Sequence, residues 1–413
     1  MVHGRRGAPV RLHRQGYRPL GAEGDLLNSS VVIVSSRPSD RLEHCLESVV
    51  HQADEIVVVD NGPPGRTAAA LARQVGAGVV RSRKNDGFAA AANRGLAATH
   101  GDLVAVLHED AVAGGGWLAA AAQLLEDPTV GAVAPRVVLA GRFLEVALDD
   151  EPFLAGGDRR PLGRKLTTAS LGGVDVLPRL TGSGIYPLEQ GHAGECWRWT
   201  VGRAPFYAPL VDTGDELDLL LNGEAVQPSR VVDLLSSAGS YLCADGSVGG
   251  IGSETPDDER LDVAEERFSL SAAAFVTTGE VLARVGGFVK RYVACYEDTD
   301  WCWRARLMGL RMFYDPGATV RLEVAPTPKL GARRERHLAE RNRLLTLVRN
   351  APLDLAMTEV WRKRRSGEDD GVAELLPKVV PRALGEREML RRRWAMRPRE
   401  VFERWAGVDV PLS

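Results

Sequence analysis

Three polar residues that directly follow an apolar run are the strongest chemical signal in this sequence. Leu103–Leu107 is typical of a buried strand, and His108, Glu109 and Asp110 come immediately after it. Two functions are open for the acids. Either they cap the loop that follows, or they hold a hard cation, which prefers oxygen ligands, against a phosphate group.

A second polar group ends another apolar run, Ile56–Val59, and reads Asp60-Asn61-Gly62. Asp60 can accept hydrogen bonds from the base or ribose of a nucleotide, or it simply forms a turn. Strands and helices alternate between Val31 and Leu107, which predicts βαβ units. Functional groups collect at the carboxyl ends of strands in such sheets, so we expect Asp60 and Asp110 at one edge.

The composition indicates a globular protein that is soluble or attached to a membrane surface. The sequence has 413 residues, of which 44% are hydrophobic, and its net charge of −3 gives no sign of a nucleic-acid partner. Five dispersed cysteines without CxxC spacing favour reduced thiols in the cytosol. Residues 1–28 form a basic leader without the apolar core of a signal peptide, and no apolar run reaches the ~18 residues of a membrane helix.

The hydrophobic pattern of the sequence changes over residues 141–235. Helical periodicity gives way to short alternating segments, and Asn222-Gly223 between apolar runs predicts a two-residue hairpin. We therefore expect a β-rich insert. Trp197 and Trp199 fall on one face of a strand there, where they either stack on a sugar ring or pack the core of the insert.

Residues 351–413 form a basic C-terminal segment with helical spacing, which Pro377 and Pro381 are expected to interrupt. The runs Arg362–Arg365 and Arg391–Arg393 stand beside aromatic and aliphatic residues. Such a segment either lies on an anionic membrane surface or packs against the rest of the protein with its arginines solvated.

Seven short segments occur in a characteristic order along the chain. They are Val57-Val-Val-Asp-Asn-Gly62, Asn85-Asp-Gly-Phe-Ala-Ala-Ala-Ala-Asn-Arg-Gly95, Glu109-Asp110, Gly116-Trp-Leu118, Val285-Gly-Gly-Phe288, Tyr296-Glu-Asp-Thr-Asp300 and Glu340-Arg-Asn-Arg343. The set resembles the family-2 glycosyltransferases, inverting enzymes with the GT-A fold, and is most similar to their rhamnosyltransferase-like bacterial branch. The resemblance implies a Rossmann-like α/β domain with a mixed, mostly parallel sheet, in which residues 29–140 bind the nucleotide sugar and residues 236–350 form the acceptor and catalytic half.

The resemblance also implies roles on the donor side. Asp110 matches the position that holds Mg²⁺ or Mn²⁺ on the diphosphate of the nucleotide sugar, and Glu109 stands for the other acid of that pair. Asn85, Gly87 and Asn93 match a turn where the backbone and the amide side chains approach the nucleotide. The alternative for these three residues is a tight turn before a helix of small residues.

Glu297-Asp298 matches the motif whose aspartate is the general base of the family. Asp298 is expected to deprotonate the acceptor hydroxyl, and Glu297 is expected to support it or to bind the sugar. Asp300 and Arg304 have the spacing of an ion pair within one helix.

Three features depart from the family pattern, and one of them is the pair Glu109-Asp110 in place of Asp-Asp. Leu322 stands where a histidine often completes the metal site, and Gly249–Gly252 stands where an Asp-Arg pair is common. Glu323 and His108 are the candidates to compensate for the missing ligand.

These expectations combine into a metal-dependent inverting glycosyltransferase of cell-envelope polysaccharide synthesis, which moves a sugar from a nucleoside diphosphate to a glycan or polyprenyl-linked acceptor. It is expected in the cytoplasm or at the inner face of the plasma membrane. One alternative is a catalytically silent module that binds a glycan or a protein, although such a module has no need of both Asp110 and Asp298. Another is a nucleotidyltransferase, which would carry a Gly-rich phosphate loop where this sequence has Ser35-Ser-Arg-Pro38.

Overall fold

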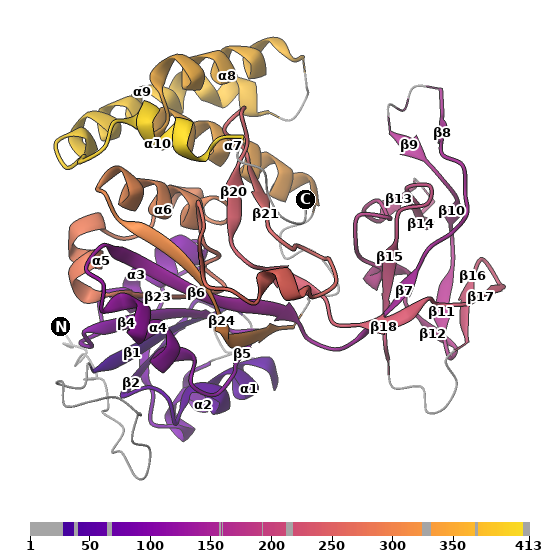
Figure 1. Cartoon of the computed structure of the whole chain (residues 1–413), viewed down its shortest axis with the longest axis horizontal. Coiled ribbons are helices and arrows are strands. Elements are labelled where there is room, and N and C mark those ends of the chain that lie inside the picture. The colour runs from indigo at the N-terminus through magenta and orange to yellow at the C-terminus, as the bar shows by residue number, and fades with distance from the viewer. Residues whose placement is uncertain are drawn as a thin grey trace.

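The computed structural model describes residues 28–36, 40–63, 68–156, 158, 160–191, 193–211, 218–323, 332–367 and 371–407. A larger lobe of helices around a sheet lies beside a smaller lobe of strands, and the two are joined where β7 (Phe143–Val146) and β18 (Arg230–Val232) lie side by side (Figure 1). The leader expected over residues 1–28 falls, except for Asn28, outside the described residues.

A ten-stranded sheet organises the larger lobe, with the order β22-β24-β6-β23-β4-β1-β2-β3; in addition, β19 pairs with β6 and β5 pairs with β24. β1 to β4 are parallel, β24 is parallel to β6, and β23 runs antiparallel to its neighbours β4 and β6. The expected mixed, mostly parallel sheet is confirmed. The bounds are β1 (Ser29–Ser35), β2 (Glu55–Asp60), β3 (Gly78–Arg81), β4 (Leu103–His108), β5 (Ala111–Ala113), β6 (Val130–Leu139), β19 (Leu235–Ser237), β22 (Glu265–Glu266), β23 (Ala274–Thr278) and β24 (Arg311–Leu322).

Helices cover both faces of this sheet because successive residues of a strand point to opposite sides. Val31 and Ile33 pack beneath the first set of helices, whereas Val32 and Val34 pack beneath the second set. The first set is α1 (Asp40–Val49), α2 (Ala69–Gln74) and α4 (Trp117–Leu125). The second set is α3 (Phe88–Leu96), α5 (Gly279–Val285) and α6 (Glu297–Leu307).

The direction of the strands brings candidate functional residues to one edge of the sheet. β1, β2, β4, β6 and β24 all end there, and the antiparallel β23 begins there. Asp60 and His108 are the last residues of β2 and β4. We refer to this edge as the carboxyl edge, and it carries the residues singled out above.

The smaller lobe consists of short strands around an apolar core of its own, which includes Leu166, Leu171 and Phe206. In the predicted hairpin, Leu221 pairs with Glu224 across Asn222-Gly223, both of which have positive φ, so this hairpin is confirmed. The strands between β7 and β18 are β8 (Phe153–Leu154), β9 (Pro161–Leu162), β10 (Lys165–Leu166), β11 (Ala169–Leu171), β12 (Val174–Asp175), β13 (Glu189–Gln190), β14 (Cys196–Trp199), β15 (Phe206–Pro209), β16 (Leu219–Leu221) and β17 (Glu224–Val226).

The C-terminal segment is helical, as expected, and its helices enclose a further core with α6. They are α8 (Leu353–Arg365), α9 (Val372–Arg391) and α10 (Pro398–Trp405), and α7 (Ala332–Asn350), which precedes the segment, contributes to the same core. The interruption expected at Pro377 and Pro381 is wrong, since α9 continues through both. Its buried residues Leu376 and Val380 pack into this core, and that packing offsets the hydrogen bonds that proline removes. Among the described residues, no helix is long and apolar enough to cross a membrane.

Candidate active site

Asp110 follows β4 at the carboxyl edge, and its neighbours hold it in place. His108 Nδ1 is hydrogen-bonded to Asp110 Oδ1, and the His108 ring stacks on Phe88 with 5.8 Å between the ring centroids. The backbone N–H of Glu323 donates to the carbonyl of Asp110 at 2.8 Å, because Leu322 at the end of β24 pairs with Ala111. The position where the family often has a histidine therefore adjoins Asp110, but leucine supplies no ligand.

The side chains around Asp110 fit a cation that takes most of its ligands from elsewhere. In the part of the chain that the structure describes, no three His, Cys, Asp or Glu side chains come together in a cluster able to hold a metal. The carboxylate of Glu323 forms an ion pair with Arg41 at 2.8 Å. Mg²⁺ and Mn²⁺ are often held by one or two carboxylates plus phosphates and water, and a hydrogen-bonded neighbour such as His108 orients such a carboxylate.

The carboxylate of Glu109 is engaged within the protein. It accepts hydrogen bonds from Ser35 Oγ at 2.8 Å and from the backbone N–H of Ser36 at 3.1 Å, and the residue is buried. Glu109 therefore holds the ends of β1 and β4 together. A direct contact of this side chain with the donor stays a prediction.

Asp60 forms both a turn and an ion pair. Its carboxylate is buried, accepts from Arg81 Nη1 at 2.9 Å and receives a longer bond from the N–H of Gly62 at 3.4 Å. The next residue, Asn61, has a hydrogen-bond acceptor that is unpaired within the described ranges. Asn61 Nδ2 donates to Asn85 Oδ1 at 3.1 Å, while its buried Oδ1 has no partner among the described residues. Buried acceptors rarely stay unpaired, so this oxygen suits a donor group of a ligand.

Gly87 and Asn93 connect the first half of the domain to the second. Gly87 has φ of +94°, and a Cβ there would lie 2.5 Å from the carbonyl oxygen of Val293. The amide of Asn93 makes two hydrogen bonds of 2.8 Å with the backbone N–H and C=O of Phe288. These contacts agree with the tight-turn alternative, and a role in donor binding stays a prediction.

The loop that Gly87 touches is strained. Val293, Cys295 and Tyr296 all have positive φ, between 66° and 68°. Residues other than glycine rarely adopt this conformation, and each costs roughly 1–3 kcal/mol. The loop leads directly into the first turn of α6, so its shape fixes where that turn begins.

One side chain of α7 holds the strained loop. Asn342 is fully buried, and its Nδ2 lies within hydrogen-bond distance of three loop carbonyls, at 3.0 Å from Tyr292 and 2.8 Å from both Ala294 and Cys295. The sequence motif around residues 340–343 contains this asparagine, but the motif alone gave it no role. In the sequence, Asn342 is distinguished only as an uncharged amide among the charged residues of this motif.

Asp298, the predicted base, lies in the first turn of α6. It is half-buried, and its Oδ2 and Oδ1 accept from the backbone N–H groups of Ala272 at 3.2 Å and Thr299 at 2.7 Å. Burial raises the pKa of this carboxyl. The N–H of His108 donates to the carbonyl of Ala273 at 2.9 Å. The dipeptide Ala272-Ala273 thus connects Asp298 with His108, which is bonded to Asp110.

Glu297 is more deeply buried than Asp298. Its Oε2 has no hydrogen-bond partner among the described residues. Burial and, secondly, the charge of Asp298 raise the pKa of Glu297 to about 8. The raised pKa favours the protonated form of Glu297, which can donate a hydrogen bond that a carboxylate cannot.

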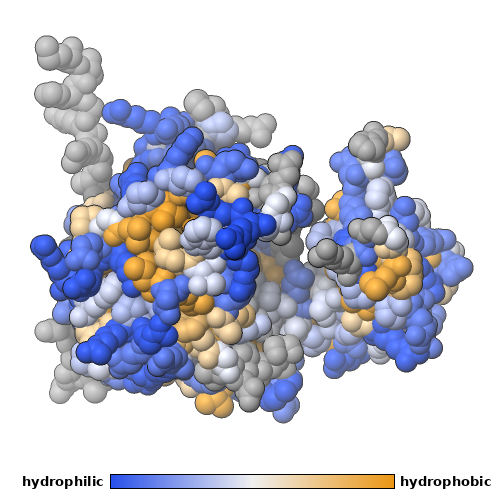
Figure 2. Space-filling model, turned by 90° about the horizontal axis from the view of Figure 1, so that it is seen from above, coloured by the Kyte–Doolittle hydropathy of each residue, from blue (hydrophilic) through white to orange (hydrophobic). Residues whose placement is uncertain are grey.

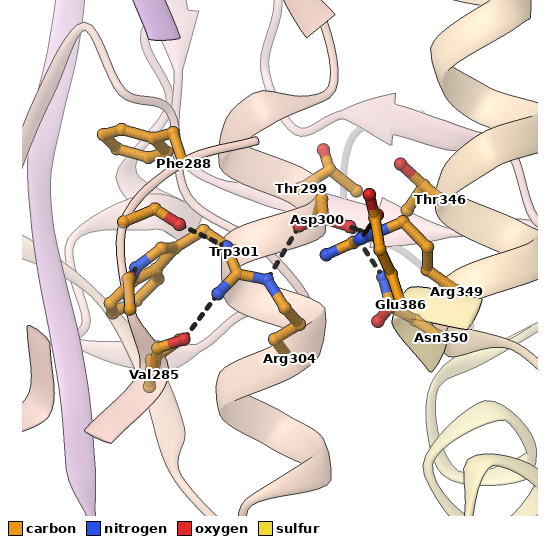
Figure 3. Close-up of polar contacts among 12 residues, drawn as sticks. Val285, Phe288, Thr299, Asp300, Trp301, Arg304, Thr346, Arg349, Asn350 and Glu386 are labelled. Carbon is orange, nitrogen blue, oxygen red and sulfur yellow. Dashed lines mark hydrogen bonds and ion pairs between the residues drawn. The ribbon is translucent and has the colours of Figure 1, made fainter. Parts of the chain in front are cut away.

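Asp300 is the centre of a buried ion network (Figure 3). It accepts from Arg304 Nε and Arg349 Nε, both at 2.8 Å, which confirms the ion pair expected with Arg304. Burial alone would raise the pKa of Asp300, but Arg349 and Arg304 hold it well below its ordinary value. Arg304 also donates to the carbonyls of Val285 and Gly287. The segments around Val285 and Asn350 thus both contact α6, through Arg304 and Asp300.

The two tryptophans of the insert lie outside its apolar core. Lys165 Nζ lies 4.1 Å from the centroid of Trp197 and 5.9 Å from that of Trp199. Trp197 Nε1 donates to Glu189 at 2.9 Å, and both rings are half-buried. Stacking of a sugar on these rings stays a prediction.

Comparison with known proteins supports the glycosyltransferase assignment for the part of the chain that carries Asp60 and Asp110. Residues 30–166 match the family described as Glycosyl transferase family 2. A TPR repeat-containing protein from Synechococcus elongatus is 37% identical over 81 residues, and the chain spans only 20% of that relative's length. The matched family and the sheet described above agree with the expected GT-A fold.

Solved structures of glycosyltransferases are also similar to this chain. One is GalNAc-T7 with UDP, GalNAc and Mn²⁺, with 14% identity over 86% of this chain and 55% of that one, and a TM-score of 0.48. Another is a Pyrobaculum calidifontis mannosyltransferase in complex with GDP-Man and Mn²⁺, with 15% identity, 88% and 85% coverage and a TM-score of 0.40. Glucosyl-3-phosphoglycerate synthase from Mycobacterium tuberculosis is 25% identical over 32% of this chain and 52% of that one, with a TM-score of 0.26.

Proposed function

We propose that the chain is a metal-dependent inverting glycosyltransferase that moves a sugar from a nucleoside diphosphate to a glycan or lipid-linked acceptor. Residues 29–140 would bind the donor and residues 236–350 the acceptor. The observation that carries the proposal is the continuous set of contacts from Asp298 through Ala272 and Ala273 to His108 and Asp110 at the carboxyl edge. In this proposal Asp298 and Asp110 serve the same site, one as general base and the other as metal ligand.

In this proposal Asp298 is the general base. The acceptor hydroxyl loses its proton to Asp298 while its oxygen bonds to the anomeric carbon, and the bond from that carbon to the diphosphate breaks. The raised pKa of Asp298 makes it a stronger base than an exposed aspartate. Protonated Glu297 would donate a hydrogen bond to the sugar. Asp110, oriented by His108, would hold Mg²⁺ or Mn²⁺, which stabilises negative charge on the departing diphosphate.

We assign the enzyme to the rhamnosyltransferase-like branch and to cell-envelope polysaccharide synthesis on its sequence motifs. A polyprenyl-linked acceptor would bring the protein to a membrane surface. Seen from above, hydrophobic residues gather in a patch on the larger lobe with hydrophilic residues around it (Figure 2). On the C-terminal helices, Trp361 is 52% and Met389 67% exposed, and the guanidinium of Arg365 lies 4.8 Å from the Trp361 ring centroid.

Sedimentation with anionic vesicles at low salt tests this membrane contact. Because α7 to α10 share a core, the full chain must be used, with Arg364→Glu and Arg365→Glu introduced together. Each basic group near an anionic surface contributes about 1 kcal/mol, so the double variant should sediment much less than the wild type. Arg203→Glu, on the exposed surface of the insert, is the matched control and should sediment normally. Equal sedimentation of all three proteins would contradict the membrane contact.

Release of nucleoside diphosphate tests the transfer itself. The full chain is incubated with UDP-, dTDP- and GDP-linked sugars, with Mn²⁺ or with EDTA, and the liberated diphosphate is measured. We expect slow release from one nucleotide class that requires the metal, through transfer to water. The Asp298→Asn variant should lose this release, and absence of release from every donor by the wild type would contradict the proposal.

A further inference from the structure

A cavity of about 360 Å³ opens where the insert meets the carboxyl edge. One wall comes from the larger lobe, with Arg41 of α1, Glu323 after β24, and Leu139 at the end of β6 together with the two residues that follow it. The other wall comes from the insert, with Arg142 and the segment of residues 178–181. The cavity exists only because the insert is attached at this place in the fold.

Hydrogen bonds fix both walls of the cavity. The carboxylate of Glu254, on the larger lobe, accepts from the N–H of Gly182 in the insert at 3.0 Å. The buried Arg198 donates to the carbonyls of Leu180 and Tyr186, which secures the same segment from behind. The N–H of Leu210 donates to the carbonyl of Arg142 at 2.8 Å. The cavity is therefore formed before any ligand arrives, which lowers the cost of binding.

The charges of the cavity are not balanced. Three arginines, Arg41, Arg142 and Arg179, stand against two carboxylates, so one positive charge is in excess. Glu323 forms an ion pair with Arg41, and Glu254 accepts from the N–H of Gly182. Arg142 and Arg179 line the cavity, are exposed to solvent, and form no ion pair or side-chain hydrogen bond with any residue in the described ranges. Two guanidinium groups are thus available to a ligand. Guanidinium binds phosphate oxygens through paired, charge-assisted hydrogen bonds.

The cavity lies next to the proposed reaction site. Glu323 belongs to its lining and, through its backbone N–H, bonds to the carbonyl of Asp110. The cavity lies on the side of β6 and β24, whereas Asp60 and Asn61 lie on the opposite side of β4 in the sheet order. The nucleotide and a ligand in this cavity can therefore occupy the carboxyl edge together.

We propose that this cavity extends the acceptor site from residues 236–350 into the insert and that it takes a phosphate-bearing saccharide, with Arg142 and Arg179 of the insert binding the phosphate. The acceptor role rests on the proposed glycosyltransferase function, whereas the binding does not. A phosphomonoester or a diphosphate carries close to two negative charges near neutral pH, and the two unpaired guanidinium groups offer its oxygens charge-assisted hydrogen bonds. The phosphate belongs either to a soluble sugar phosphate or to the diphosphate of a polyprenyl-linked saccharide.

Calorimetric titration of the full chain in EDTA tests the binding independently of donor and metal. The probes are glucose 1-phosphate for the soluble source, farnesyl diphosphate for the lipid-linked source, and uncharged glucose as the reference. We expect at least one phosphate-bearing probe to bind more tightly than glucose. The variant with Arg142→Ala and Arg179→Ala should weaken that binding at least about tenfold. Arg203→Ala, another exposed arginine of the insert, should leave it unchanged.

The outcomes separate the two sources and the two proposals. Arginine-dependent binding of glucose 1-phosphate supports a soluble acceptor, and the same result with farnesyl diphosphate supports a lipid-linked one. If neither probe binds, if glucose binds equally well, or if the double variant binds as the wild type does, the proposal is overturned. Binding of UDP, dTDP or GDP with Mn²⁺ is measured on the same double variant and should be unchanged, so failure of the glycosyltransferase function would be recognised separately.

Discussion

Replacement of Asn342 by alanine should release the loop that leads into Glu297 and Asp298. The amide of Asn342 has two N–H groups, shared among the carbonyls of Tyr292, Ala294 and Cys295. Each bond contributes about 1 kcal/mol, and each buried carbonyl left unpaired, here those of Ala294 and Cys295, costs about 1–3 kcal/mol. The carbonyl of Tyr292 keeps the N–H of Ala294 at 2.7 Å. We therefore expect the free energy of unfolding to fall by roughly 2–4 kcal/mol.

Because the loop is strained, Asn342→Ala should change the conformation of the loop in addition to lowering the stability of the protein. Three residues with positive φ store several kcal/mol of strain, at roughly 1–3 kcal/mol each. This strain relaxes when the hydrogen bonds of Asn342 to the loop are lost. The thiol of Cys295 reports the change, because burial and then the charge of Glu297 raise its pKa to about 11 in the closed loop. Alkylation of Cys295, followed by peptide mass spectrometry, should be several-fold faster in Asn342→Ala than in the wild type.

Asn350→Ala provides a matched control for this experiment. Asn350 is a fully buried asparagine of the same helix, and its Nδ2 donates to Asp300 rather than to the loop. It should lower the unfolding free energy without accelerating alkylation of Cys295 or slowing turnover of the folded enzyme. Equal alkylation rates for Cys295 in Asn342→Ala and the wild type, with unchanged turnover, would refute the reasoning.

Three further changes test the residues of the site. Asp110→Asn should abolish the Mn²⁺-dependent part of nucleoside diphosphate binding, measured by calorimetry with and without EDTA; unchanged metal dependence would remove Asp110 from the metal site. Asp298→Asn should retain donor binding but lower kcat by a factor of ~10² to 10⁴; loss of donor binding would make Asp298 a donor contact instead. The raised pKa of Glu297 means that the folded state retains a proton that the unfolded state releases, so stability should fall as the pH rises from about 4.5 to about 8. Glu297→Gln should flatten this decline in urea denaturation midpoints, and an unaltered pH profile would show that another group is responsible.

Local patterns predicted the elements of the sheet well. The apolar runs at residues 31–34, 56–59 and 103–107 are strands, and the spacing of Leu42, Cys45, Leu46 and Val49 marks the buried face of α1. These patterns work because a strand or a helix buries residues at a fixed period. Local reasoning failed at Pro377 and Pro381, where packing of α9 against α7 outweighs the local cost of proline.

The partners of the site residues depend on contacts between distant segments. Glu109 bonds to Ser35, which is 74 residues away, and Asn93 bonds to Phe288, which is 195 residues away. Asn342 reaches a loop about fifty residues earlier in the chain. The sequence placed candidate groups at the ends of strands, but which of them bind each other follows from the sheet order and the packing of α7.

Binding of nucleoside diphosphates is the most direct test of the central claim, that the carboxyl edge holds a metal-bound nucleotide sugar. The melting temperature of the full chain is measured with UDP, dTDP or GDP, each with Mn²⁺ and with EDTA. A ligand that binds the native state stabilises it by RT ln(1 + [L]/Kd), about 2.7 kcal/mol at a hundred times Kd. We expect a rise in melting temperature with one class of nucleotide, only when Mn²⁺ is present, and no such rise in Asp110→Asn. No rise with any nucleotide, or a rise that is equal in EDTA and in Asp110→Asn, would contradict the central claim.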